Sequence, residues 1–388
     1  VQLAVAAGAA EVRLTQDIQV SEAISIQGRS IRLIGGFASC HHAANNIAPV
    51  SRRLTPLRVP FDLARIFTLS NLAGGSIDIH LERLILTDPG SESRSPVDNG
   101  GAILAQGAMN LVLQDMEIIG TRARLRGGAV HVNDGVTLRT RLKTNIGAAQ
   151  TLFSSVADAG GGGVYCRDST VILGESTALY FNDAKANGSG GGMHANNCVV
   201  RILARSLPGP SIDFGFSSNT AGRHGGGIFA AENSRVYLLG GNDCLIGEIC
   251  NDRRQPVRFS NNHAGAVAVG SGRGGAIALD GSRLSASQIS LRANSAHQGG
   301  GLSAVNGSEV FILPPGFLDP DARGRLKDCW STSRCNEVSD NWAGFQSSGG
   351  SGGAVFLIDS DAQLVNTRME QNSGDLASVI DVDGLSWV

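Results

Sequence analysis

The sequence predicts an all-β protein, a right-handed parallel β-helix (a single-stranded β-solenoid). Three observations predict it. A Gly-Gly-Ala/Gly-aliphatic motif recurs eight times, apolar residues alternate with period two after each copy, and an apolar-x-x-Asn motif follows later in most units. The composition agrees, because 52 of 388 residues are Gly and only 17% are charged. A net charge of −2 with both signs scattered argues against nucleic acid as a partner.

Residues 1–98 lack the Gly-Gly motif but keep the alternation. Alternating apolar pairs between Val12 and Leu33 predict an opening coil that caps the core, and those between Ile77 and Leu86 predict a further coil. The polar stretch 38–61 contains three prolines and is interpreted as a long loop. The chain starts at Val1 without a signal-peptide pattern, so we expect a mature or trimmed piece of a longer protein.

Residues 99–388 carry the repeats and continue the same solenoid, because no linker composition separates the two parts. A unit of about 25–30 residues cannot bury its apolar face alone, but stacked units can. Gly and Asn tolerate positive φ and therefore mark the corners. The two longest intervals hold inserted loops, and about 12 to 14 coils are expected at about 4.8 Å each. The first glycines of the motif are Gly100, Gly127, Gly161, Gly190, Gly225, Gly274, Gly299 and Gly352.

Within each unit, the third and fifth residues after the first Gly are apolar or small and are predicted to point inward. The fourth residue must then point outward, and large side chains recur there. Apolar and aromatic residues on the outside of a solenoid indicate a contact surface for protein, glycan or a second copy of the chain. The alternative is that an inserted loop covers them. This outward column comprises Leu104, His131, Tyr165, His194, Phe229 and Phe356.

Seven cysteines include two pairs with the same spacing, Cys244 with Cys250 and Cys329 with Cys335. Both pairs lie in segments that look inserted between repeats, and we interpret them as small disulfide loops, with reduced structural thiols as the alternative. Disulfides would place the protein in an oxidising, extracytoplasmic setting. Cys166 stands at an inward position and is interpreted as a small core residue. The pairing of Cys166, Cys198 and Cys40 stays open.

The repeated pair of motifs, as in Phe259–Asn262 and Gly274–Ile277, resembles the repeats of the chlamydial polymorphic outer-membrane proteins and related bacterial β-helix repeat proteins. The resemblance covers about residues 99–372. It implies an autotransporter passenger that is secreted or displayed on the outer surface of a bacterium. It also implies a non-catalytic adhesin or scaffold that binds a protein or glycan of a host or neighbouring cell. No stretch approaches 18 uninterrupted apolar residues, so no membrane span is expected.

Two other functions stay open. Parallel β-helices also serve as polysaccharide lyases and glycoside hydrolases. Arg122, Arg124 and Arg126 alternate in one predicted strand, so they could grip an acidic sugar chain from a shared face, or simply be solvated. Asp359 and Asp361 could bind Ca²⁺, but paired carboxylates at coil edges are more often turn residues. We therefore assign no catalytic residue, no metal and no cofactor. The third possibility is a self-assembling structural or filament subunit.

Overall fold

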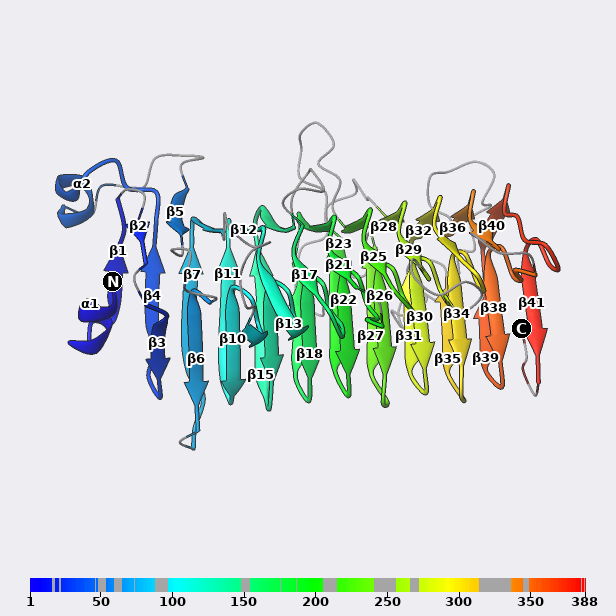
Figure 1. Cartoon of the computed structure of the whole chain (residues 1–388), viewed down its shortest axis with the longest axis horizontal. Helices are drawn as coiled ribbons and strands as arrows, with labels where there is room; N and C mark the ends of the chain where they lie inside the picture. The colour runs from blue at the N-terminus through cyan, green and yellow to red at the C-terminus, as the bar shows by residue number, and fades with distance from the viewer. Residues whose placement is uncertain are drawn as a thin grey trace, which may run out of the picture.

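The computed structural model describes residues 1–15, 18–20, 22–45, 47, 54–58, 65–72, 74–87, 97–147, 154–174, 176–185, 187–204, 215–240, 256–265, 272–313, 336–344, 349–384, 386 and 388. In this part of the chain, strands stack side by side into a rod with the termini at opposite ends (Figure 1). All pairings are parallel, in three sheets of eleven strands and one of eight. The predicted parallel β-solenoid is therefore confirmed.

Two sheets follow each other directly in every complete coil. Sheet 1 begins after the Gly-Gly corner and contains β3 (Ile24–Gln27), β6 (Phe67–Asn71), β10 (Ile103–Gly107), β14 (Val130–Asn133), β18 (Val164–Arg167), β22 (Met193–Asn196), β26 (Ile228–Ala231), β30 (Ile277–Asp280), β34 (Leu302–Val305), β38 (Val355–Ile358) and β41 (Ile380–Asp383). Sheet 2 contains β1 (Glu11–Arg13), β4 (Ile31–Ile34), β7 (Ile77–Glu82), β11 (Met109–Gln114), β15 (Val136–Arg141), β19 (Thr170–Leu173), β23 (Val199–Ala204), β27 (Arg235–Gly240), β31 (Arg283–Ser287), β35 (Glu309–Leu313) and β39 (Asp361–Leu364).

The other two sheets complete the coil. Sheet 3 contains β2 (Ile18–Gln19), β5 (Thr55–Arg58), β8 (Leu84–Thr87), β12 (Glu117–Ile119), β16 (Thr144–Ile146), β20 (Thr177–Tyr180), β24 (Gly215–Ser217), β28 (Val257–Ser260), β32 (Ile289–Arg292), β36 (Asn336–Ser339) and β40 (Thr367–Glu370). Sheet 4 is short and leads back to the next Gly-Gly corner through β9 (Val97–Asn99), β13 (Arg122–Arg126), β17 (Val156–Ala157), β21 (Asp183–Ala184), β25 (Thr220–Ala221), β29 (His263–Ala264), β33 (Ser295–Ala296) and β37 (Trp342–Ala343).

The register joins equivalent residues of successive coils. Ile228 pairs with Ile277 and Leu302 pairs with Val355, so the two longest sequence intervals each advance the solenoid by one coil only. The described sheets therefore have eleven rungs and not the expected 12 to 14. Eleven rungs correspond to a stack about 48 Å long at about 4.8 Å a step.

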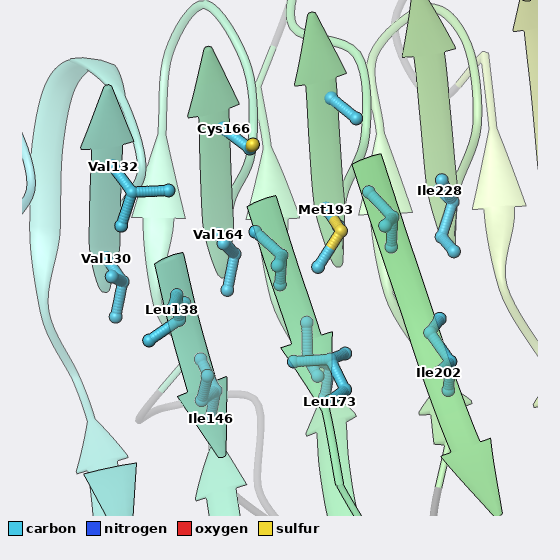
Figure 2. Packing of buried hydrophobic residues seen from close by; sticks show 14 of the residues in the cluster. Val130, Val132, Leu138, Ile146, Val164, Cys166, Leu173, Met193, Ile202 and Ile228 are labelled. Atoms are coloured by element: carbon cyan, nitrogen blue, oxygen red, sulfur yellow. The ribbon is translucent and has the colours of Figure 1, made fainter. Parts of the chain in front are cut away.

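The core runs through the middle of the rod as one continuous cluster from Val5 to Ala362. Val164, Met193 and Ile228, third residues of their units, are fully buried as predicted. Figure 2 shows them stacked along sheet 1, opposite Leu173 and Ile202 of sheet 2. In such a column each apolar side chain is shielded from water by the side chains of the coils before and after it.

The corner between sheets 3 and 4 is held by the asparagines of the apolar-x-x-Asn motif. Each side-chain amide donates to the side-chain oxygen of the next coil's asparagine at 2.9–3.0 Å. The asparagines thus stack from coil to coil, and their bonds satisfy polar groups that would otherwise be buried without a partner. The ladder comprises Asn182, Asn219, Asn262, Asn294, Asn341 and Asn372.

The N-terminal end differs from the prediction in two respects. Helix α1 (Gln2–Ala6), and not the first coil, closes the core, since Val5 is buried and Gln2 accepts a hydrogen bond from the backbone N–H of Ser25 in β3. The interpreted loop 38–61 contains helix α2 (Cys40–Ala44) and strand β5. Pro56 lies within β5, in register with Ile85 of β8.

Candidate binding surfaces

The outward column forms one line along sheet 1, as the register predicted. His131 pairs with Leu104 and Tyr165, and the pairing continues along the sheet to Phe356. Four consecutive rungs carry rings whose centroids lie 4.9 Å apart, in the order His131, Tyr165, His194, Phe229. Such spacing is that of stacked or tilted rings in contact.

The expectation that this column is open to solvent is wrong for half of it. Tyr165 is 1% exposed, Phe356 3% and His131 5%, whereas Leu104, His194 and Phe229 are half-buried. A contact role for the column remains a prediction, and a partner would reach the partly exposed side chains first.

Residues just before the Gly-Gly corner cover the rings. The Arg126 guanidinium carbon lies 5.0 Å from the Tyr165 ring centroid, and the His224 ring lies 5.8 Å from that of Phe229. The backbones of these corner residues form β-bridges from one coil to the next, as Arg126 does with Gly160. They continue along the rod beside sheet 1. The alternative cover, the segment around Cys329 and Cys335, lies outside the described residues.

The imidazoles of the column and of the corner residue His224 are neutral over most of the pH range. Burial lowers the pKa of His131, His194 and His224 to about 4 in each case. The charge of Arg126 lowers the pKa of His131 and His194 further, and Arg273 does so for His224. Within the described residues, the Nδ1 atoms of all three rings lack a hydrogen-bond partner. The column is thus an uncharged strip above about pH 5.

The three arginines of β13 make three separate contacts. The pairing of β13 with β9 shifts register between Ala123 and Arg126, a bulge that breaks the alternation. Arg122 lies 3.8 Å from the Asp158 carboxylate, Arg124 donates to Asp98 at 2.8 Å, and Arg126 covers Tyr165. A common grip of the three arginines on an acidic sugar chain stays a prediction.

The structure shows a disulfide pairing that the sequence left open. Cys166 in β18 forms a disulfide with Cys198, which lies 32 residues later at the corner after β22. Cys166 is buried in the core as expected, but it is half of a crosslink between successive coils and not merely a small apolar residue. Cys40 in α2 is exposed and unpaired. The predicted loops of Cys244 with Cys250 and Cys329 with Cys335 lie outside the described residues.

Among the described residues, no group of three or more His, Cys, Asp or Glu side chains lies close enough to hold a metal ion. In the same part of the chain, no helix has the length and hydropathy needed to cross a membrane.

Two charged residues that the sequence analysis did not single out, Arg235 and Arg283, lie on the outer face of sheet 2. The available signal was the alternation around Val236 and Leu238, which turns their neighbours outward.

The stacked parallel sheets and the asparagine ladder place the chain in the class of parallel β-helix repeat proteins. Residues 256–280 match the Chlamydia polymorphic membrane protein repeat. The matched segment runs from β28 through the Asn262 corner to β30, so it is the Asn-to-Gly-Gly part of one coil. This match confirms the resemblance of the repeats to a family of outer-membrane surface proteins. No curated protein and no solved structure matches the chain.

Proposed function

We propose that this chain is a secreted or surface-displayed rod of a bacterium, similar to an autotransporter passenger, that acts as a non-catalytic adhesin or scaffold. The observation that carries the proposal is the match of residues 256–280 to the polymorphic membrane protein repeat. The disulfide between Cys166 and Cys198 supports an extracytoplasmic setting, because such bonds persist in oxidising compartments.

The geometry of the rod supports a binding role. Outward side chains recur at about 4.8 Å along each sheet, so an extended glycan or protein segment can contact several rungs at once. Several weak contacts on one rigid scaffold add up to a strong attachment, because the later contacts form within an existing complex. The partner that this geometry suits is a protein or glycan at the surface of a host or neighbouring cell.

Adhesion of coated beads tests the proposal. Beads bearing the whole chain are applied to cultured epithelial cells, with albumin-coated beads as the control, and a panel of acidic and neutral polysaccharides is assayed for both binding and turnover. Adhesion or glycan binding without turnover is the expected result. Turnover of any polysaccharide would contradict a non-catalytic role, and absence of both adhesion and binding would contradict the adhesin.

Sedimentation of the purified chain over a range of concentrations completes the test. A scaffold that attaches cells is expected to stay at one size as its concentration rises. Concentration-dependent polymers would contradict the proposal and favour the self-assembling subunit instead.

A further inference from the structure

A hollow of about 460 Å³ opens on the outer face of sheet 2, across strands β27, β31 and β35. Its volume lies within the range of about 300–1,000 Å³ that is usual for small-molecule sites. Its lining includes Arg235, Tyr237, Arg283, Ser285 and Glu309, none of which belongs to the outward column of sheet 1. The hollow is therefore a separate candidate site.

The hollow exists because β31, the middle rung, lies lower than its two neighbours at two places, a small side chain and a short corner. Ser285 stands in register between Tyr237 and Phe311, so a hydroxymethyl group separates two aromatic rings of one column. The preceding corner is also shorter. Only Gly281 lies between β30 and Ser282, whereas two residues, Glu232–Asn233 and Asn306–Gly307, fill the same corner in the coils on either side.

The charges around the hollow are incompletely balanced. Arg235 and Arg283 are direct partners in the register, an arrangement of like charges that is unfavourable in a sheet. Arg283 leans toward β35, where it forms an ion pair with Glu309 at 3.1 Å and lies 4.6 Å from the Phe311 ring centroid. Arg235 is exposed and forms no ion pair within the described part of the chain. An anion between the two guanidinium groups would relieve their repulsion.

The aromatic wall has one face available. Arg201 of β23 lies 5.9 Å from the Tyr237 ring centroid. Since β23 and β31 flank β27 on opposite sides, the other face of Tyr237 borders the low rung at Ser285. Because Arg283 covers the Phe311 ring, the hollow offers a single flat apolar face beside a cation.

We propose that this hollow binds an acidic pyranose unit of a polysaccharide, its carboxylate or sulfate group between Arg235 and Arg283 and its ring against Tyr237. Guanidinium groups recognise such anions strongly. The Glu309 carboxylate and the Ser285 hydroxyl, which both line the hollow, accept hydrogen bonds from sugar hydroxyls. Glu309 also disfavours a ligand with several phosphates. The inference rests on the proposed binding function and deepens it by naming a ligand class and a site.

Calorimetry on the intact chain tests the inference with three probes at matched ionic strength. The probes are the α-1,4-linked tetramer of galacturonic acid, the neutral tetramer maltotetraose, and sodium sulfate. The acidic tetramer is expected to bind at least about tenfold more tightly than either of the others, because it alone combines the anion with the ring. Equal binding of maltotetraose or of sulfate would overturn the assignment.

Three variants locate the site. Arg235→Gln is expected to weaken binding of the acidic tetramer by about tenfold or more, since it removes a charge-assisted hydrogen bond. Ser285→Phe is expected to abolish it, because a ring in register with Tyr237 and Phe311 fills the low rung. Arg139→Gln, on the exposed face of β15 outside the hollow, is the matched control and should bind normally. Normal binding by Arg235→Gln would overturn the inference, as would normal binding by a folded Ser285→Phe or no binding by the unaltered chain.

The bead assay separates this inference from the proposed function. Beads carrying the unaltered chain that adhere to no cell contradict the adhesin, whatever the calorimetry shows. Beads carrying Ser285→Phe that adhere as well as the unaltered chain contradict the hollow as the adhesive site and leave the adhesin standing. Arg235→Gln changes an exposed side chain, so it keeps the test valid if Ser285→Phe fails to fold.

Discussion

The outer faces of sheets 1 and 2 both carry aromatic side chains in line, and the face of sheet 2 is hollowed between its rings. On sheet 1, rings occupy four successive rungs, and the corner residue Arg126 covers Tyr165. On sheet 2 a serine separates Tyr237 from Phe311 and leaves a hollow. Strand alternation thus decides which way a side chain points, whereas the residues of the preceding corner and of the neighbouring rungs decide whether it meets solvent.

Acid should affect the covered face most. In the unfolded chain His131, His194 and His224 take up protons below about pH 6.5, whereas burial keeps them neutral in the folded chain down to about pH 4. Their contribution to stability is therefore complete above pH 6.5 and is lost as the pH falls to 4. Each pH unit in that window lowers the unfolding free energy by on the order of 1 kcal/mol for each histidine. Urea unfolding at pH 7 and pH 5 measures the loss.

The matched control replaces the three histidines by glutamine together and should flatten most of this dependence. His263, whose pKa burial also lowers, keeps a remainder. Asp183 acts in the opposite direction, because burial raises its pKa and so favours the folded state at low pH. An unfolding free energy that is equal at pH 7 and pH 5 in the unaltered chain would contradict the neutral strip.

Removing one ring from each face gives the next largest effect. Tyr165→Ala should cost about 3–5 kcal/mol of unfolding free energy, since it empties a fully buried space. Tyr237→Ala should cost about 1 kcal/mol or less, because that ring is half-buried beside a hollow. Chemical denaturation of the two variants provides the comparison. Equal losses would mean that the two faces do not differ as described.

The fold could be predicted from the sequence because each coil repeats the same pattern of glycine, apolar and asparagine positions. The third residue after the first Gly of the motif is apolar in all eight units, and residues such as Val164 and Met193 are indeed buried. The corner asparagines follow the same logic, since each one bonds its equivalent in the next coil. A repeated pattern fixes positions relative to neighbours, and neighbours are what build a solenoid.

The surfaces could not be predicted in the same way. The cover over Tyr165 depends on where the chain returns after β13, and the bulge in that strand moves Arg126 away from its expected face. The disulfide joins Cys166 and Cys198, which are 32 residues apart in sequence but only one coil apart in space. Such contacts between coils arise from local departures from the repeat, and a period alone does not encode them.

The disulfide lies on the inner side of the covered face, so its loss should loosen that face first. Cys166→Ala combined with Cys198→Ser should cost about 3–4 kcal/mol, the entropy of a closed loop of this length. Serine suits position 198 because Ser234 occupies the same corner in the next coil, where its hydroxyl accepts from the Cys198 backbone N–H. Hydrogen exchange should increase around β18 and stay unchanged around β35. A uniform increase along the rod would contradict a local effect.

The smallest expected effect concerns the cation on each face. Arg126→Gln should cost about 1 kcal/mol, because it removes a cation–π contact over a desolvated ring, whereas Arg283→Gln removes a more exposed one from Phe311 and should cost about 0.5 kcal/mol. The pKa values of the neighbouring histidines also distinguish the two variants. The charge of Arg126 lowers the pKa of His131 and His194, so its removal should raise both pKa values toward 6.5, as NMR titration of the imidazoles would record. Arg283→Gln should leave them unchanged. A shift in both variants would show that the charges of the two faces are coupled through the rod, and the contrast between a sealed face and an open one would then fail in its electrostatic part.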